Sequence, residues 1–155
     1  MKRLLAKLFL WILNIIVAIW PVEANASNLV QAGKTDCGTL YVDIDTVEVL
    51  KKDSQYFLLF AAEEKFTDTE FLQALHSDED LATVTSAYYL YMFNSSGIEY
   101  YLLNKYLLDD AGKVVVDLSE EAKAIVLRRE DIALLRAYAI SLKVVDKKKK
   151  IRRFY

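Results

Sequence analysis

A single cysteine, a single histidine and two groups of carboxylates are the side chains of this chain that could do chemistry. Cys37 and His76 would supply the nucleophile and the general base of a thiol enzyme. Such a dyad needs contact in space and a third group that orients the imidazole, and no familiar signature surrounds either residue. A lone cysteine in an extracellular protein is more often a small buried side chain or an intermolecular disulfide partner. We therefore expect no catalytic residues.

The carboxylates are grouped at Asp43, Asp45 and Glu48, and again at residues 78–80. Either group offers the oxygen ligands that calcium prefers, and paired carboxylates also serve glycoside hydrolysis. Neither group has the glycine or the spacing of an EF-hand loop. On a strand, Asp43 and Asp45 share one face, as on the solvated side of a sheet. We predict neither a metal site nor a cofactor, and the sequence also lacks nucleotide-binding and hydrolase motifs.

The tyrosines are concentrated in one segment, where six of the ten are Tyr88, Tyr89, Tyr91, Tyr100, Tyr101 and Tyr106. Alternation along a strand places Tyr89 and Tyr91 on one face. Because tyrosine is favoured at binding surfaces, Tyr89, Tyr91 and Tyr101 are the candidate aromatic platform. Cover of this face by a helix over residues 130–145 is the simpler alternative, and we favour it.

The charge is divided between two parts of the chain. Residues 27–142 carry 10 basic and 20 acidic side chains, whereas residues 143–155 carry 7 basic side chains and 1 acidic one. Basic tails bind polyanions by releasing counterions. The candidate surface-binding residues are the cations Lys147, Lys148, Lys149, Lys150, Arg152 and Arg153. The alternative is a solvated chain end without a partner.

The first 26 residues have the three parts of a secretory signal. A basic opening precedes thirteen uncharged residues, Leu8–Trp20, and Pro21 and the small residues Ala24 and Ala26 follow. As a helix, the apolar stretch would span roughly 20 Å, less than the ~30 Å hydrocarbon core. We therefore expect cleavage after Ala26 and export to the periplasm, the cell surface or the medium. Retention as an uncleaved anchor is the alternative.

The rest of the chain alternates β-prone runs with two amphipathic segments. We expect strands at residues 38–43, 46–50, 56–62, 84–93, 98–108 and 113–118 and helices at 67–76 and 130–145, and residues 122–127 fit either type. Thr67 is the expected N-cap of the first helix. These elements predict an α+β fold, a mostly antiparallel meander of hairpins with one or two packed helices. The expected organisation is a signal peptide at 1–26, a flexible leader at 27–37, one domain at 38–145 and a basic tail at 146–155.

The segment Tyr41–Val47, followed by a polar turn and an aromatic strand, resembles the opening of surface-adhesin-E-like domains. A turn before a strand at residues 109–115 and an apolar segment at 124–142 are similar to later parts of that pattern. This chain departs from the pattern because it lacks tryptophans in the core strands and a cysteine near its end. The resemblance implies an exported, non-enzymatic bacterial envelope domain, and it supplies no binding residue.

These observations together predict a non-enzymatic, adhesin-like domain of the cell envelope. We expect it to bind an anionic envelope surface or an extracellular macromolecule, with peripheral membrane contact as one form of that binding, and not to bind nucleic acid. Two alternatives remain open. One is a small secreted hydrolase or thiol enzyme that uses Cys37 and His76 or an acidic pair, and the other is a structural subunit that self-associates through a free sheet edge.

Overall fold

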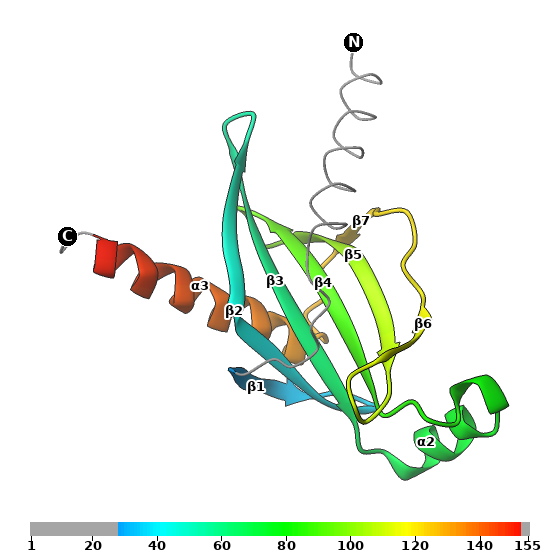
Figure 1. The fold of residues 1–155 in the computed structure, drawn as a ribbon. Coiled ribbons are helices and arrows are strands. Elements are labelled where there is room, and N and C mark those ends of the chain that lie inside the picture. Colours follow the sequence, from blue (N-terminus) through cyan, green and yellow to red (C-terminus); the bar gives the residue numbers. More distant parts are fainter. Residues whose placement is uncertain (1–27, 153–155) are drawn as a thin grey trace.

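The computed structural model describes residues 28–152, with side chains as far as Lys149. The signal peptide expected at residues 1–26 lies outside the described residues, as does Arg153. Figure 1 shows a twisted sheet with one long helix packed against it and a short helical segment at the opposite end.

The described residues form one antiparallel sheet of seven strands. The sheet order is β1 (Leu29–Lys34), β2 (Gly38–Lys52), β3 (Gln55–Phe66), β4 (Ser86–Asn94), β5 (Glu99–Leu108) and β6 (Val114–Asp117), and β7 (Ala124–Val126) also pairs with β5. Helix α2 (Thr69–His76) and the 3-10 turn η1 (Glu79–Leu81) connect β3 to β4, and helix α3 (Ile132–Arg152) follows β7. This is the α+β meander that the sequence predicts, and residues 122–127 contribute a strand.

β2 is one long strand where the sequence predicts two. It pairs with β3 on both sides of a register shift between Asp43 and Glu48. The Thr46 hydroxyl lies at this irregularity, where it accepts a hydrogen bond from the Ala61 N–H at 2.9 Å and donates one to the Asp43 carbonyl at 2.7 Å. A side chain therefore replaces missing ladder bonds, and a bulge joins the two predicted segments into one bent strand.

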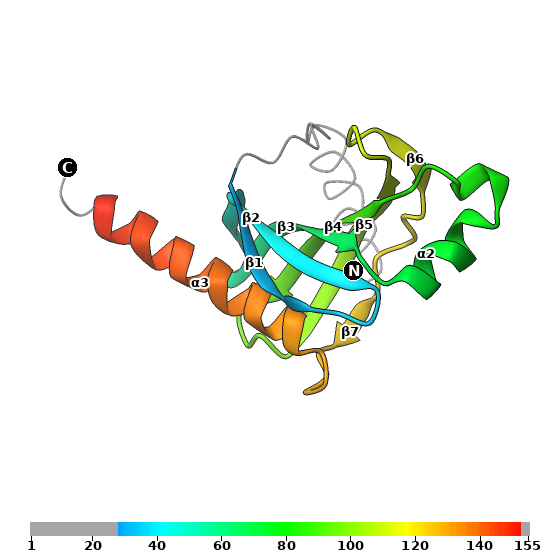
Figure 2. The ribbon, with the colours of Figure 1, turned by 90° about the horizontal axis from the view of Figure 1, so that it is seen from below.

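α3 covers one face of the sheet and closes the larger hydrophobic core, as Figure 2 shows from below. Its inward residues recur at helical spacing, and Ala137 is 0% exposed. The Tyr138 ring stacks on Phe93 of β4 with ring centroids 4.8 Å apart. The buried residues that the sheet contributes to this core are Ala32, Leu40, Val42, Val47, Leu58, Phe60, Ala62, Tyr91 and Phe93.

β3 supplies buried residues to both faces of the sheet, as its continuous apolar run predicts. Successive side chains of a strand point to opposite faces, so Leu58 and Phe60 face α3 while Leu59 lies on the other side. The buried residues on that other side are Leu59, Ala61, Tyr88, Leu90, Met92, Leu103 and Leu108. The two clusters explain why the central strands carry so few polar residues.

Three boundaries predicted from the sequence are wrong. The expected leader at residues 27–37 contains strand β1, which pairs with β2. The expected tail at residues 146–155 begins inside α3, because the helix continues without a break to Arg152. Asp68, and not Thr67, caps α2, since its carboxylate accepts a hydrogen bond from the Phe71 N–H at 2.7 Å.

Two glycines are required by close packing. A Cβ atom at Gly38 would lie 1.9 Å from the Lys65 carbonyl oxygen, so β2 and β3 approach each other there only without a side chain. Gly97, in the turn between β4 and β5, has a φ of +67° and sits against the Tyr138 ring, 2.7 Å from the position of a Cβ. The hairpin turn is thereby tied to α3.

Candidate binding sites

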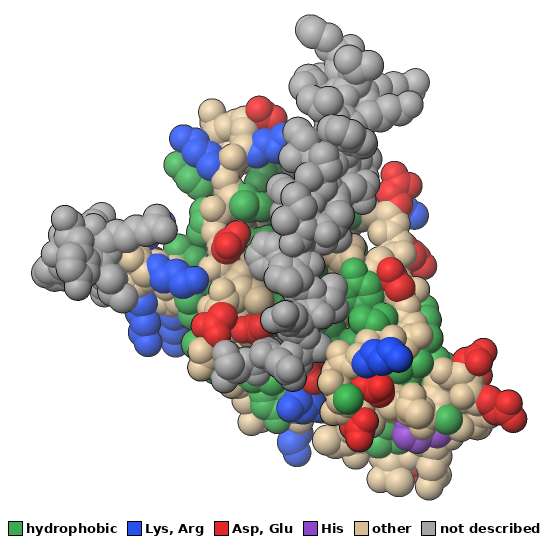
Figure 3. Space-filling model, viewed as in Figure 1, with side chains coloured by type: hydrophobic (Ala, Val, Ile, Leu, Met, Phe, Trp, Pro, Cys, Tyr) green, Lys and Arg blue, Asp and Glu red, His purple; other side chains and the backbone are tan. Residues whose placement is uncertain are grey.

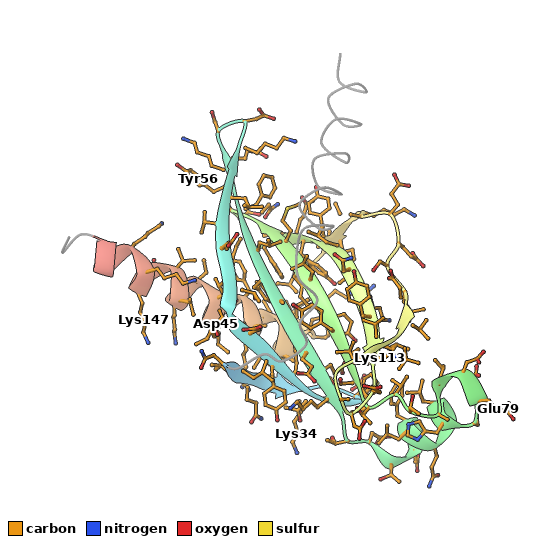
Figure 4. All side chains as sticks on the ribbon, in the orientation of Figure 1. Lys34, Asp45, Tyr56, Glu79, Lys113 and Lys147 are labelled. Carbon is orange, nitrogen blue, oxygen red and sulfur yellow. The ribbon has the colours of Figure 1, made fainter. Side chains whose placement is uncertain are left out.

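The C-terminal part of α3 extends past the edge of the sheet and carries the predicted basic residues (Figure 1). The side chains of Lys147, Lys148 and Lys149 are exposed. Lys150 and Arg152 continue the helical backbone, and Arg153 lies outside the described residues. Figure 3 shows Lys and Arg side chains gathered along this part of the helix, and Figure 4 marks Lys147 on it. The predicted tail is therefore helical as far as Arg152.

One of these lysines turns back toward the sheet. The Lys148 Nζ donates a hydrogen bond to the Val47 carbonyl at 2.9 Å. Val47 lies in the β2 bulge, where its carbonyl is not part of the β2–β3 register. Lys148 and Lys149 also line a cavity of about 330 Å³ with Glu48, Val49 and Val145. The basic end of α3 is thus anchored to β2 at Lys148.

The three tyrosines predicted as one platform are divided between the two faces of the sheet. Tyr89 and Tyr91 face α3, whereas Tyr101 pairs with Met92 and packs on the opposite side. A register shift between Leu90 and Tyr91 sets this pairing. The predicted platform of three does not form, and Tyr100 takes the place of Tyr101.

Tyr89, Tyr91 and Tyr100 form a continuous aromatic row instead. The ring centroids of Tyr89 and Tyr91 are 5.7 Å apart, and those of Tyr91 and Tyr100 are 5.8 Å apart in an edge-to-face arrangement. Tyr91 is 8% exposed, and its hydroxyl has no hydrogen-bond partner among the residues that the structure describes. The row belongs to the same hydrophobic cluster as Ala133, Leu134 and Ala137 of α3, so it lies on the face of the sheet against which the helix packs.

A buried carboxylate lies at the end of this row. Glu64 of β3 is 9% exposed and accepts hydrogen bonds from the Thr35 hydroxyl and, at 2.7 Å, from the Tyr89 hydroxyl. Within residues 28–149, no lysine or arginine forms an ion pair with it. Burying a charged carboxylate without a counterion is costly. The hydrogen bonds that Glu64 accepts from the two hydroxyl groups offset part of that cost.

Glu64 is not among the site residues predicted from the sequence, although the sequence carries a signal for it. Leu58, Phe60, Ala62 and Glu64 are spaced by two along β3, so the apolar face continues into a carboxylate. The register confirms that Glu64 lies beside residues of the α3-covered face, opposite Leu40 of β2. A carboxylate on the core side of a strand is an exception that calls for a functional explanation.

Glu64 and the aromatic row open into a cavity of about 410 Å³ at the start of α3. The residues lining it include Lys34 and Asp36, beside the turn from β1 to β2, and Glu130 and Asp131, just before α3. Lys34 is exposed at its rim and is labelled in Figure 4. Four carboxylates and one lysine therefore surround a partly aromatic cavity.

The tyrosine hydroxyls of this cavity resist ionisation. Burial raises the pKa of Tyr89 well above its usual range, and the Glu64 carboxylate raises it further through its charge and its hydrogen bond. Burial also raises the pKa of Tyr91, with smaller contributions from Tyr100 and Glu64. Both hydroxyls remain protonated donors at neutral pH.

Cys37 and His76 are not brought together. The His76 Nε2 lies 2.7 Å from the Val84 carbonyl oxygen, which fixes its ring beside β4. Cys37 is partly buried, and burial together with the Glu64, Asp36 and Asp68 carboxylates raises the pKa of its thiol. A raised pKa is the reverse of what a nucleophilic cysteine requires.

One carboxylate of each acidic group accepts a local backbone hydrogen bond. Asp43 is 7% exposed, and its carboxylate accepts a hydrogen bond from the Asp45 N–H at 3.1 Å, while burial raises its pKa. Asp45 is exposed and accepts a hydrogen bond from the Asn28 amide at 2.8 Å. Asp78 caps η1 through the Asp80 N–H at 3.0 Å. In the described part of the chain, no cluster of three His, Cys, Asp or Glu side chains has a metal-binding arrangement.

The chain was compared with protein families, curated proteins and solved structures, and none of the three comparisons found a match. No helix among residues 28–152 is both long enough and apolar enough to span a membrane.

Proposed function

We propose that this chain is an exported, non-enzymatic domain of the bacterial cell envelope that attaches to an anionic surface through the basic end of α3. The single observation that supports this proposal is the extension of α3 past the sheet as an exposed lysine-rich helix. A helix presents its cations at fixed positions, so less conformational entropy is lost on binding than with an unstructured tail. The resemblance to surface-adhesin-E-like domains favours the same class of function.

The distribution of charge defines how the domain would meet such a surface. Each cation near an anionic membrane contributes roughly 1 kcal/mol, so a cluster of four to six gives measurable binding. Acidic side chains are distributed over the face of the molecule seen in Figure 3, including the α2 and η1 end on its right. The acidic body would be repelled from the same surface, and we expect α3 to be the point of contact.

The enzymatic alternative has weaker support. Cys37 has a raised pKa and no imidazole beside it, and one carboxylate of each acidic group, Asp43 and Asp78, accepts a backbone hydrogen bond. A nucleophile–base pair within hydrogen-bond reach is the geometric requirement of a thiol or serine hydrolase. The described residues offer none of the predicted pairs in that arrangement.

The experiment replaces the four consecutive lysines Lys147, Lys148, Lys149 and Lys150 by glutamine in the mature chain. Binding to vesicles of phosphatidylglycerol and phosphatidylcholine is measured by co-sedimentation at low and at high salt. We expect the wild type to bind at low salt and release at high salt, and the variant to bind about tenfold more weakly or less.

The matched control replaces four lysines of the body, Lys51, Lys52, Lys113 and Lys123, by glutamine. This control changes the net charge by the same amount but leaves α3 intact, so its vesicle binding should follow the wild type. Equal weakening in both variants would show that net charge, and not the basic helix, determines binding. Equal binding by wild type and the α3 variant would remove the proposed attachment site.

A further inference from the structure

We propose that the cavity bounded by Glu64 and the tyrosine row binds a primary ammonium group on a flexible alkyl chain. A lysine side chain of a partner protein and a free alkyl diamine both have this chemistry. The site lies at the N-terminal end of α3, away from the basic end that the proposed function uses. Binding of an ammonium group at this site is independent of surface attachment and is an additional activity of the domain.

Glu64 provides the charge for this recognition. Its carboxylate offers roughly four lone-pair positions, and the hydroxyls of Thr35 and Tyr89 donate to both of its oxygens without supplying a positive charge. A cation that enters the cavity therefore finds a nine-tenths buried carboxylate that lacks a counterion among residues 28–149. An ammonium group can donate to the remaining lone pairs while both hydroxyls stay in place.

The tyrosines provide the aromatic surface and a further acceptor. Tyr91 lines the cavity, its side chain is nine-tenths buried, and its hydroxyl has no partner in the described chain. Its ring packs against those of Tyr89 and Tyr100, and all three tyrosines line the cavity together with Glu64. Aromatic rings next to a carboxylate are the arrangement by which proteins hold ammonium ligands.

The charges around the rim favour a cation over an anion. Asp36, Glu130 and Asp131 are exposed at the opening, and Lys34 is the only cation that lines it among the described residues. Arg128 lies close enough to Tyr100 to favour its ionisation, which lowers the Tyr100 pKa against the larger effect of burial, but Arg128 is not part of the lining. The start of α3 would attract an anion by its dipole, yet Glu130 and Asp131 occupy that position and Glu64 repels a second negative charge.

The dimensions agree with a ligand of this size. A cavity of about 410 Å³ accommodates the alkyl chain and the ammonium group of one lysine side chain. Leu40, Ala133 and Leu134 line part of it and supply apolar contact for the methylene groups. The ligand would thus be held by charge at one end and by apolar burial along its stem.

Binding is tested by amide chemical-shift titration of the mature chain with cadaverine and, separately, with a glycine–lysine–glycine peptide. Pentanol and pentanoate serve as neutral and anionic controls of similar length. We expect saturable shifts at the amides of Tyr89, Tyr91 and Tyr100 with an amine and none with the controls. Saturation by the peptide alone would identify a protein lysine as the ligand, and saturation by both would identify the amine itself. No saturable shift with either amine, or equal shifts with pentanol or pentanoate, would overturn the proposal.

Two variants test the residues. Glu64→Gln should weaken cadaverine binding about tenfold, whereas Glu63→Gln, which changes the neighbouring carboxylate on the opposite face, should leave it unchanged. If Glu64→Gln does not fold, Tyr91→Phe replaces it, because that change removes only a hydroxyl without a partner in the described chain and should weaken binding about threefold. Undiminished binding in the folded variant would overturn the proposal.

Discussion

The two halves of α3 have the same secondary structure and opposite environments. From Ile132 to Val145 the helix packs on the sheet, and Ala137 and Ser141 are fully buried. From residue 146 onward its described side chains are exposed, and lysines replace the apolar residues. The first half is stabilised by packing, whereas the second half continues a helix that the first half has already nucleated. One element can therefore serve the fold and also present a charged surface.

The largest expected effect is on the free energy of unfolding, and it distinguishes the buried side from the exposed side of the packed half of α3. Ala137→Asp places an unpaired carboxylate at a fully buried position, and we expect it to lower the free energy of unfolding by about 3–5 kcal/mol. Ala139→Asp makes the same change two residues away on the exposed side and should cost less than about 1 kcal/mol. Urea unfolding followed by circular dichroism measures both. Similar losses in the two variants would show that this half of α3 does not pack as described.

A second prediction concerns the sheet tyrosines. Burial is the main cause that raises the pKa of Tyr88 to about 12 and those of Tyr89 and Tyr91 further. The folded protein therefore retains these protons above the usual tyrosine pKa of ~10, while the unfolded chain loses them. The unfolded state then binds fewer protons, so stability falls as the pH rises above ~10.

The measurement is an alkaline titration of tyrosinate absorbance in the folded protein and in guanidinium chloride. We expect at least three tyrosines to stay protonated at pH ~11 in the folded state and to ionise on unfolding. Tyr89 and Tyr91 lie on the face covered by α3, and Tyr88 lies on the other. Tyr88→Phe should therefore reduce the retained set by one, and it serves as the control for assignment. Ionisation of every tyrosine at its usual pKa before unfolding would contradict the packing of both faces.

Much of the fold was predictable because the hydrophobic pattern and the turns agree. The hairpin of β4 and β5 and the start of α3 follow from apolar periodicity and from a polar turn that ends in glycine. Strand β1 was not predictable in the same way. Its Ala32 and Gly33 are small, which suggests flexibility in a sequence, but a Cβ at Gly33 would already lie 3.3 Å from the Ala133 backbone. Small residues here allow α3 to approach β1.

The candidate sites were predictable only in part. The basic residues 147–150 are visible as a charge run, but their helical continuation depends on the packed half that precedes them. The assignment of Tyr101 to the platform failed because the face of a strand residue depends on register, and a shift at Leu90 and Tyr91 alters the pairing across the hairpin. The hydrogen bonds that hold the buried Glu64 carboxylate come from Thr35 and Tyr89, which are distant from it in the sequence, so the sequence alone does not show this group of residues.

The smallest effect tests where the packed half ends. Lys148→Met removes the hydrogen bond from Nζ to the Val47 carbonyl but keeps the aliphatic stem, and we expect a loss of roughly 0.5–1 kcal/mol. Lys147→Met, in the preceding position, removes the same charge and should change stability by less than ~0.5 kcal/mol. Urea midpoints of the two variants give the difference. A loss of stability confined to the Lys148 variant would show that the packed half of α3 ends at the β2 bulge, about one helical turn beyond Val145. The Val47 carbonyl can accept the lysine hydrogen bond there because it is not paired in the β2–β3 register. Equal effects of the two substitutions would instead end it at Val145 and leave all the lysines equally available to an anionic surface.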